Sequence, residues 1–464
     1  MDTPELKQIW KNKYQVVPTQ LEKIKQIKTA ATAFNANIDA VIKISVEKFA
    51  ELVAKEGLSL ADLENVTETK INSPADVLKG IFKCFREGIA EEWITEEKSV
   101  YDWMYEKIGY DHLQIGGQGG IVANALATVG IQNVYVHTNS LPKLQADQFV
   151  KKDNLFSFDD SGEPAPAYTI NRQAETPLIH WIIEFNKNDV FTIEGHNFRC
   201  PKSNRFIATY DPLNLKLVTD EHFIRYVRNH PMQYVILSGF HALTANNNGV
   251  TLIDKILPEI KIWKQKSPEG IFHLEIASTQ DKIIRKAIVE KVAPLMDSLG
   301  INERETIDVL EIIGEESLAE QCRRQTTSEN LFAGLVKIKE KTGVARIQLH
   351  MFGLYITLQD KSFRITPEAD LRGMMTAATI AAAKAGTGNI DNLLWAQGRE
   401  VSDVGLIEAD SLAWATGQND LAQTGIGRFR NWDLIVAPTI LIEKPLTLVG
   451  MGDTISSLSL VGAL

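Results

Sequence analysis

The stretch LTLVGMGDTISS, residues 446–457, places two glycines and a carboxylate where an apolar run gives way to small polar residues that could open a helix. Gly450 and Gly452 allow the backbone to approach a ligand closely, and the free N–H groups of a helix's first turn attract anions. Asp453 could accept a proton from a hydroxyl while these amides hold a phosphoryl group. Such a turn could therefore perform phosphoryl transfer to an alcohol; the alternative is that Asp453 only caps the helix, because one Gly-x-Gly pair is weak evidence by itself.

Other polar residues also lie where apolar, strand-like runs end. Asn37 and Asp39 follow one such run, the Gly116-Gly117-Gln118 turn precedes a helix of small residues, and Glu275 ends the run IFHLE. Open α/β sheets bind ligands at the carboxyl ends of their strands, so we predict that these residues meet Asp453 in one site. Each of them alone is more typical of an ordinary turn or helix cap, and it is their combination that favours chemistry.

Three further features each have two interpretations. Asn302 and Glu305, in GINERE, could bind a ligand, but Asn followed three residues later by Glu is also a helix capping box. Arg205 in NRFIATY could hold phosphates through its guanidinium group or form a surface ion pair. His350 in IQLHMFG could stack on a purine ring or lie satisfied in the core.

Composition excludes several classes of protein. The chain has 464 residues, 44% of them hydrophobic, which is enough for two or more domains. A net charge of −10 argues against a nucleic-acid-binding surface. Cys84, Cys200 and Cys322 are scattered and lack metal-ligand spacing, so we expect free thiols in a reducing compartment. With no apolar signal core and no apolar run of membrane-spanning length, the sequence predicts a cytoplasmic protein without membrane contact.

The order of the segments predicts an α/β protein. Strand-like and helical segments alternate over residues 1–45, 111–150 and 221–464, which is typical of a doubly wound sheet flanked by helices. Residues 46–110 are mainly helical in pattern, and residues 151–220 alternate between polar and apolar positions, as antiparallel strands do. We predict that these two segments form a smaller α/β lid domain.

The segments NANID, GGQGG, NRFI, HLE, NERE and VGMGDTISS, in this order and over nearly the whole chain, resemble the ADP-dependent sugar kinases. This is the glucokinase and phosphofructokinase group of the ribokinase-like superfamily. Its HxE motif matches residues 273–275, its NxxE motif residues 302–305 and its GxGD motif residues 450–453. The resemblance implies a large nucleotide-binding domain, a lid that closes over the sugar, Mg²⁺ as cofactor, and ADP as phosphoryl donor with AMP as product.

The resemblance also implies roles for individual residues. Asp453 resembles the family's general base, and Gly450 and Gly452 shape its anion hole. Glu275 and Glu305 match residues that organise Mg²⁺. The remaining matches are Arg205 with a phosphate-contacting arginine, His350 and Val436 with adenine contacts, and Asn37, Asp39, Gly116, Gly117 and Gln118 with positions around the sugar hydroxyls.

Two positions favour glucose over fructose 6-phosphate as the acceptor. Glu92 aligns with a glutamate that the family's glucose-phosphorylating members use to bind a sugar hydroxyl. His180 and Trp181 stand where the phosphofructokinases have an Asn-Arg pair, and they provide no fixed charge for a 6-phosphate. Arg172 and Lys202 could compensate, which keeps a bifunctional enzyme possible.

Three hypotheses follow from the sequence. The first is an ADP-dependent glucokinase, closer to the glucokinase type of the family. The second is a phosphofructokinase or bifunctional kinase. The third is a catalytically silent sugar- or nucleotide-binding protein. In each case the expected partners are a small sugar and ADP, and the expected state is a monomer or a small homo-oligomer.

Overall fold

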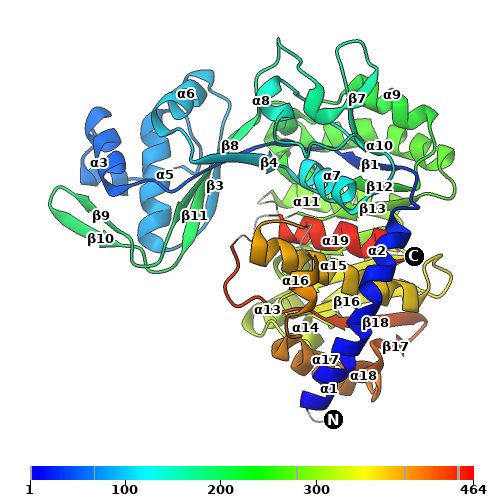
Figure 1. Cartoon of the computed structure of the whole chain (residues 1–464). Helices are drawn as coiled ribbons and strands as arrows, with labels where there is room; N and C mark the ends of the chain where they lie inside the picture. The colour runs from blue at the N-terminus through cyan, green and yellow to red at the C-terminus, as the bar shows by residue number, and fades with distance from the viewer. Residues whose placement is uncertain (1–2, 67, 278, 280, 391–392, 447–449) are drawn as a thin grey trace.

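Two separate sheets organise the molecule. The computed structural model describes residues 3–66, 68–277, 279, 281–390, 393–446 and 450–464. These residues form a large part around an eleven-stranded sheet and a smaller part, at the left of Figure 1, around a five-stranded sheet. The predicted fold class, an α/β protein with a doubly wound sheet and a smaller α/β part, is confirmed.

The large sheet is parallel in its centre and antiparallel at both edges. Its central strands are short apolar runs such as YVIL, buried on both faces, as expected when helices cover a parallel sheet. In spatial order the strands are β17 (Ile426–Phe429), β18 (Trp432–Pro438), β16 (Leu354–Asp360), β15 (Arg346–Met351), β14 (Ser298–Ile301), β13 (Ile271–Glu275), β12 (Tyr234–Leu237), β1 (Ala30–Ala33), β5 (Val134–Val136), β6 (Leu155–Phe158) and β7 (Pro164–Pro166).

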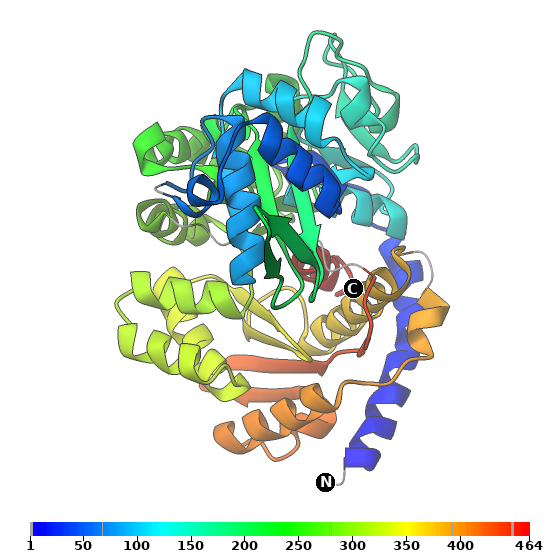
Figure 2. The same ribbon diagram turned by 90° about the vertical axis from the view of Figure 1, so that its left-hand side faces the viewer.

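Helices cover both faces of the large sheet and enclose three apolar clusters (Figures 1 and 2). One face carries α2 (Val17–Ile24), α7 (Gln118–Val129), α15 (Pro367–Thr387) and α19 (Met451–Val461). The other carries α9 (Glu221–Asn229), α10 (Gly249–Lys266), α11 (Lys282–Ala287), α12 (Glu303–Ile312) and α14 (Ser328–Thr342). The large part also contains α1 (Thr3–Lys13), α8 (Lys143–Ala146), α13 (Glu316–Arg324), α16 (Leu393–Gln397), α17 (Asp403–Thr416) and α18 (Leu421–Thr424).

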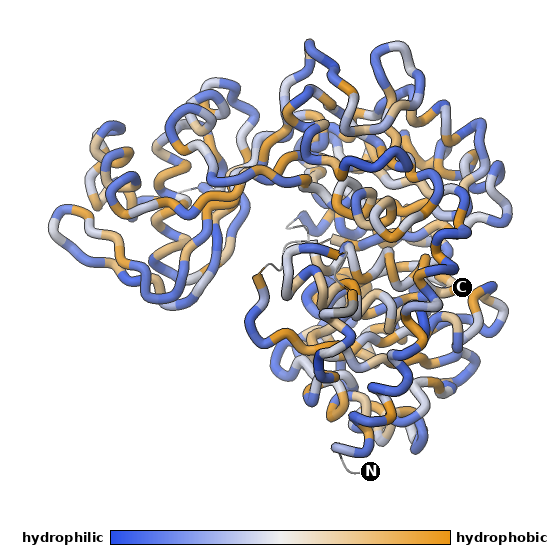
Figure 3. Tube along the Cα trace, in the orientation of Figure 1, coloured by the Kyte–Doolittle hydropathy of each residue, from blue (hydrophilic) through white to orange (hydrophobic). Residues whose placement is uncertain are grey.

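The small sheet is packed on one face and open on the other. Its strands, in spatial order, are β3 (Glu91–Thr95), β11 (Asn204–Tyr210), β8 (Ile179–Phe185), β2 (Asn37–Ile42) and β4 (His112–Gly116). Helices α3 (Val46–Lys55) and α5 (Pro74–Glu87) cover the packed face, and α4 (Leu60–Glu64), α6 (Lys98–Trp103) and the hairpin of β9 (Val190–Ile193) and β10 (His196–Arg199) complete this part. Hydrophobic residues, orange in Figure 3, follow the strands of both sheets.

Four strands correct the predicted domain boundaries. β2 and β4 were expected in the large domain but belong to the small sheet, whereas β6 and β7 were expected in the lid but extend the large sheet beyond β5. The run KTAATAFNANIDAVIKI is therefore two strands in two sheets, joined at residues 34–36. Strand patterns are the same whichever sheet a strand joins, because pairing is decided by partners distant in sequence.

Other expectations have simpler outcomes. Cys84, Cys200 and Cys322 are free, as expected, and all three are buried. Among the residues described here, no helix has the length and apolar character needed to cross a membrane. The apolar run expected before Gly450 falls on residues 447–449, which lie outside the described residues.

Candidate active site

The turn at the start of α19 contains two glycines, Gly450 and Gly452, so no side chain covers its backbone there. Gly450 has a φ of +63°, a left-handed conformation that suits glycine. A Cβ atom on Gly450 would lie 2.7 Å from Cδ1 of Ile121, and one on Gly452 would lie 3.0 Å from Nε2 of His350. Asp453 follows in the first turn of α19, where free N–H groups and the helix dipole attract an anion. The turn can therefore present a carboxylate and an anion site side by side.

Asp453 is partly buried, and a residue of another helix holds it. Nε2 of Gln118, the first residue of α7, donates a hydrogen bond of 2.8 Å to Oδ1 of Asp453. Burial raises the pKa of Asp453, while the bond from Gln118 and the charge of Lys384 oppose this rise. An ionised carboxylate with a raised pKa is a better proton acceptor than a solvent-exposed aspartate, which suits a general base.

The residues predicted to hold a sugar form one cluster. Asn37 and Asp39 lie in β2, where Nδ2 of Asn37 donates to Oδ1 of Asp39 at 3.4 Å. Gly116 of β4 pairs in register with Asn37, and a Cβ atom there would overlap the Asp39 carboxylate. A Cβ atom on Gly117, whose φ is +70°, would lie 2.5 Å from Oδ1 of Asn37. Burial is the main reason why the pKa of Asp39 rises to about 6. Gln118 links this cluster to residues 450–454 at the start of α19, which we call the catalytic turn.

A second polar group, rich in carboxylates, lies on the same sheet. Nε2 of His180 lies 3.1 Å from Oδ2 of Asp211, and its Nδ1 lies 4.0 Å from Oε1 of Glu92. Thr209 donates a hydrogen bond of 2.6 Å to Glu92. Burial alone would lower the pKa of His180, but the bond to Asp211 and the charges of Asp211, Glu92 and Asp39 together raise it. The group offers several acceptors for sugar hydroxyls.

Strand register places Arg205 on the open face of the small sheet. Asp39 of β2 pairs with His180 of β8, and His180 pairs with Thr209 of β11. Four residues further along these strands, Arg205 pairs with Glu184. Paired residues, and residues an even number apart on one strand, share a face, so Arg205 lies on the same face as His180 and Asp39. Among the contacts of the described residues, none joins Arg205 to Asp453.

Trp181 lies on the opposite, packed face. It is fully buried in the core between the small sheet and helices α3 and α5. Of the pair His180 and Trp181, only His180 therefore contributes to the open face.

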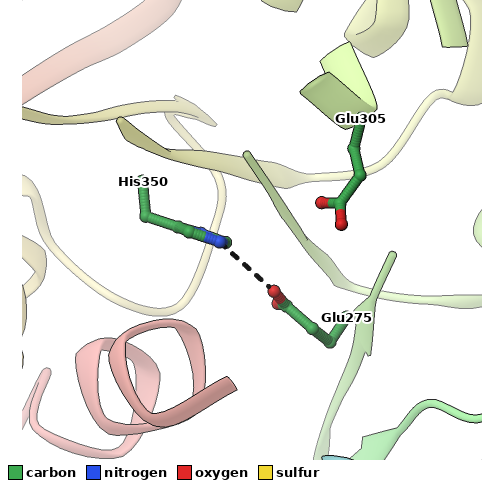
Figure 4. A group of neighbouring side chains, drawn as sticks. All are labelled: Glu275, Glu305 and His350. Atoms are coloured by element: carbon green, nitrogen blue, oxygen red, sulfur yellow. Dashed lines mark ion pairs between the residues drawn. The ribbon is translucent and has the colours of Figure 1, made fainter. Parts of the chain in front are cut away.

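Three residues from different elements form a group that could hold a cation (Figure 4). Glu275 ends β13, Glu305 lies in the first turn of α12 and His350 lies in β15, and their ligand atoms lie within 4.8 Å of one another. Nε2 of His350 lies 3.5 Å from Oε1 of Glu275. Burial, then the charges of Glu305 and Asp453, raise the pKa of Glu275 well above its usual range. A divalent cation would offset this repulsion, so the donor set fits one.

Of the two interpretations of Glu305, the structure confirms the capping box. Glu305 forms this box with Asn302: the Asn302 side chain accepts from the N–H of Glu305, and Oε2 of Glu305 accepts from the N–H of Asn302, both at 2.9 Å. The same carboxylate belongs to the group with Glu275. Capping therefore orients Glu305 toward the candidate cation site.

The two predicted adenine contacts have different surroundings. His350 lies against Gly452 and Glu275, and burial lowers its pKa to about 4, so the ring is neutral near pH 7. Val436 is fully buried in the middle of β18, and its N–H donates to the carbonyl of Gly425 at 2.9 Å. The structure does not bring the side chain of Val436 to the site, because an apolar strand residue follows the same pattern whether it faces a core or a pocket.

Three residues near the site were not predicted. Asp211 follows β11, and His241 follows β12 and lies near Glu92, His180 and Asp211. The rule that polar residues at strand ends bind ligands could have found both. Lys384, the single charged residue in the run AATIAAAKAG, reaches the catalytic turn from α15. An isolated charge in an apolar run was its only signal.

The geometry defines the class of protein. Asp453 could accept a proton from an alcohol, and the free N–H groups at the start of α19 could hold the phosphoryl group that the alcohol attacks. This is the arrangement of a kinase with a hydroxyl acceptor.

The chain belongs to the family whose model is described as the ADP-specific phosphofructokinase/glucokinase conserved region, which matches residues 28–462. It is an ADP-dependent sugar kinase. It is 29% identical over 455 residues to the ADP-specific phosphofructokinase of Methanosarcina acetivorans, covering 93% of this chain and 92% of that protein. It is also 29% identical over 471 residues to the ADP-dependent glucose/glucosamine kinase of Pyrococcus furiosus, covering 99% and 98%.

Solved structures agree with this assignment. The last common ancestor of ADP-dependent phosphofructokinases from Methanosarcinales superposes with a TM-score of 0.84 and 28% identity, covering 100% of this chain and 99% of that one. An ADP-dependent kinase in complex with fructose-6-phosphate and ADPbetaS superposes with a TM-score of 0.82 and 27% identity, covering 98% and 97%. The ribokinase-like fold and the family resemblance read from the sequence are confirmed.

Proposed function

We propose that this ADP-dependent sugar kinase transfers the terminal phosphoryl group of ADP to the 6-hydroxyl of glucose and releases AMP. The observation that carries this proposal is the cluster of carboxylates on the open face of the small sheet: Asp39, Glu92 and Asp211 surround His180. Carboxylates accept hydrogen bonds from sugar hydroxyls. They repel a sugar phosphate, which carries nearly two negative charges at pH 7.

The two cations that could have compensated for this charge are placed elsewhere. Arg172 is buried, donates to the carbonyl of Phe158 and pairs with Asp220 at 2.5 Å. Lys202 lies beside Gly88 at the end of α5, on the packed side of the small sheet. Neither supports a phosphate-binding role next to His180.

In the proposed reaction, the oxygen of the 6-hydroxyl forms a bond to the β-phosphorus of ADP. The bond from this phosphorus to the bridging oxygen breaks, AMP leaves, and the hydroxyl proton passes to Asp453. Glu275 and Glu305 would hold Mg²⁺, partly through water, and His350 would orient that water. Mg²⁺ would neutralise charge on the phosphates. Arg205 would reach them from the small sheet when the two sheets approach.

A second candidate is a phosphofructokinase or a bifunctional kinase. A cavity of about 670 Å³ lies between the small sheet and helices α7, α15 and α19, and Lys151 and Lys152 line it together with Gln114 of β4. A sugar phosphate that extended into this cavity would meet positive charge. The phosphofructokinase relatives support this alternative.

The decisive assay is a set of four initial rates with Mg²⁺, pairing ADP or ATP with glucose or fructose 6-phosphate and detecting the products directly. We expect turnover with ADP and glucose, and a preference over fructose 6-phosphate of about 100-fold or more in kcat/KM, because like charges cost several kcal/mol. Comparable turnover of both sugars would establish the bifunctional alternative. Turnover of fructose 6-phosphate alone would refute the glucose assignment.

Glu92 gives a second test of the sugar pocket. Replacing Glu92 by alanine removes an acceptor for a sugar hydroxyl, so we expect the KM for glucose to rise about 10- to 100-fold while the KM for ADP changes little. The matched control is Glu91→Gln. Its carboxylate pairs with Lys83 at 2.7 Å and accepts from Nε1 of Trp93 at 2.8 Å, away from His180. Equal effects of Glu92→Ala on both KM values would rule out the sugar contact.

A further inference from the structure

Lys384 connects the end of one helix to the start of another. It lies in the last turn of α15, between the buried residues Ala383 and Ala385, and its side chain crosses to the catalytic turn. Its Nζ atom lies 3.3 Å from the carbonyl oxygen of Gly450 and 3.1 Å from Oγ1 of Thr454. The N–H and hydroxyl of Thr454 also donate to this carbonyl. The ammonium group thus joins the two residues that bracket Asp453.

Lys384 is a partly buried cation close to the N-terminus of a helix, which is an unfavourable place for a positive charge. Burial lowers the pKa of Lys384, and the charges of Asp453 and Asp39 oppose this effect. A cation near the N-terminus of a helix is unfavourable with respect to the helix dipole, so this ammonium group depends on neighbouring anions. The groups that act on Asp453 come from three other elements: Gln118 of α7, Lys384 of α15 and Glu275 of β13. Lys384 is the cation among them.

We propose that Lys384 is a positioning residue for phosphoryl transfer: it fixes the turn from Gly450 to Thr454 and supplies the positive charge that the Asp453 carboxylate faces. Nothing in the motif GxGD includes this residue, which lies 69 positions before Asp453 in the chain. The inference rests on the sugar kinase activity of the chain but not on which sugar is the acceptor.

The test compares Lys384→Met and Lys384→Arg with the wild type, using whichever sugar the wild type phosphorylates. Lys384→Met keeps much of the side-chain length but removes the charge and the donors. We expect kcat to fall about 10- to 100-fold, a range typical of groups that orient a reactive residue, with both KM values nearly unchanged. Lys384→Arg should recover a substantial part of kcat. The matched control is Lys266→Met, an exposed lysine in the last turn of α10.

The pH profile separates this role from a purely structural one. Asp453 must be ionised to accept the proton, and loss of the neighbouring cation raises its pKa further. The acid limb of kcat/KM should therefore move to higher pH in Lys384→Met and stay near its wild-type position in Lys384→Arg. Wild-type kcat in Lys384→Met would overturn the proposal, and so would a loss of kcat with an unmoved acid limb.

A second variant, Thr454→Val, tests the positioning role of Lys384 if Lys384→Met does not fold. Thr454→Val is nearly isosteric and removes one acceptor of Lys384 but leaves its charge. A lower kcat with unchanged KM values would support the role of the tethered turn, whereas unchanged kcat would overturn it. Because the wild type's own sugar serves as substrate, an error in the glucose assignment would show in the wild-type rates and not in this comparison.

Discussion

Replacing Asp453 by asparagine is expected to lower kcat by about 10²–10⁴-fold while ADP still binds, since a positioned base typically contributes this much to the rate. The amide keeps the shape of the side chain and can still pair with Gln118, but it cannot take the proton of the acceptor hydroxyl. Initial rates with direct product detection measure the loss, and calorimetric titration with ADP measures binding.

A matched control is available in another helix. Asp403 also lies in the first turn of a helix, α17, but its side chain is 59% exposed and pairs with Lys7. Asp403→Asn should leave kcat unchanged. Near-normal turnover of Asp453→Asn would remove the assignment of Asp453 as the base. Loss of ADP binding in this variant would instead indicate that the substitution had changed the conformation of the turn at residues 450–454.

Replacing Glu305 by glutamine should raise the free Mg²⁺ concentration required for half-maximal turnover by about 10- to 100-fold. Glutamine can replace glutamate in a capping box, so α12 should keep its start and the melting temperature should stay close to that of the wild type. The substitution therefore removes the charge next to Glu275 and preserves the cap. Rates measured against free Mg²⁺, together with Mn²⁺ binding followed by electron paramagnetic resonance, provide the two readouts.

The control for this variant is Glu316→Gln, which changes an exposed glutamate in the first turn of α13. It should change neither the Mg²⁺ dependence nor Mn²⁺ binding. An unchanged Mg²⁺ dependence in Glu305→Gln would mean that Glu305 acts only as a helix cap.

A large part of the candidate site could be predicted from the sequence, because its signals are short patterns of neighbouring residues. Glycines at Gly450 and Gly117 mark backbone turns, and Asp453, Asn37 and Glu275 are polar residues where apolar strand-like runs end. These signals depend on neighbours within a few residues. The capping box at Asn302 is equally local, and the structure contains it.

Long-range packing decided the rest. Sequence periodicity could not show that β1 and β2 belong to different sheets, or that β6 extends the large one, because strand pairing depends on partners far along the chain.

The same limit applies to individual side chains. Arg172 is a possible phosphate ligand in the sequence, but in the structure it is paired with Asp220. His350 could equally have been a core residue until β15 placed it beside Glu275.

Lys384 shows the limit most clearly. It lies in an alanine-rich helix and reaches Gly450 and Thr454, on either side of Asp453, only because α15 packs against α19. The types of residue and the local turns were thus determined by the sequence itself. Which of these residues face one another was decided by the tertiary structure, because burial, charge and distance depend on elements that only folding brings into contact.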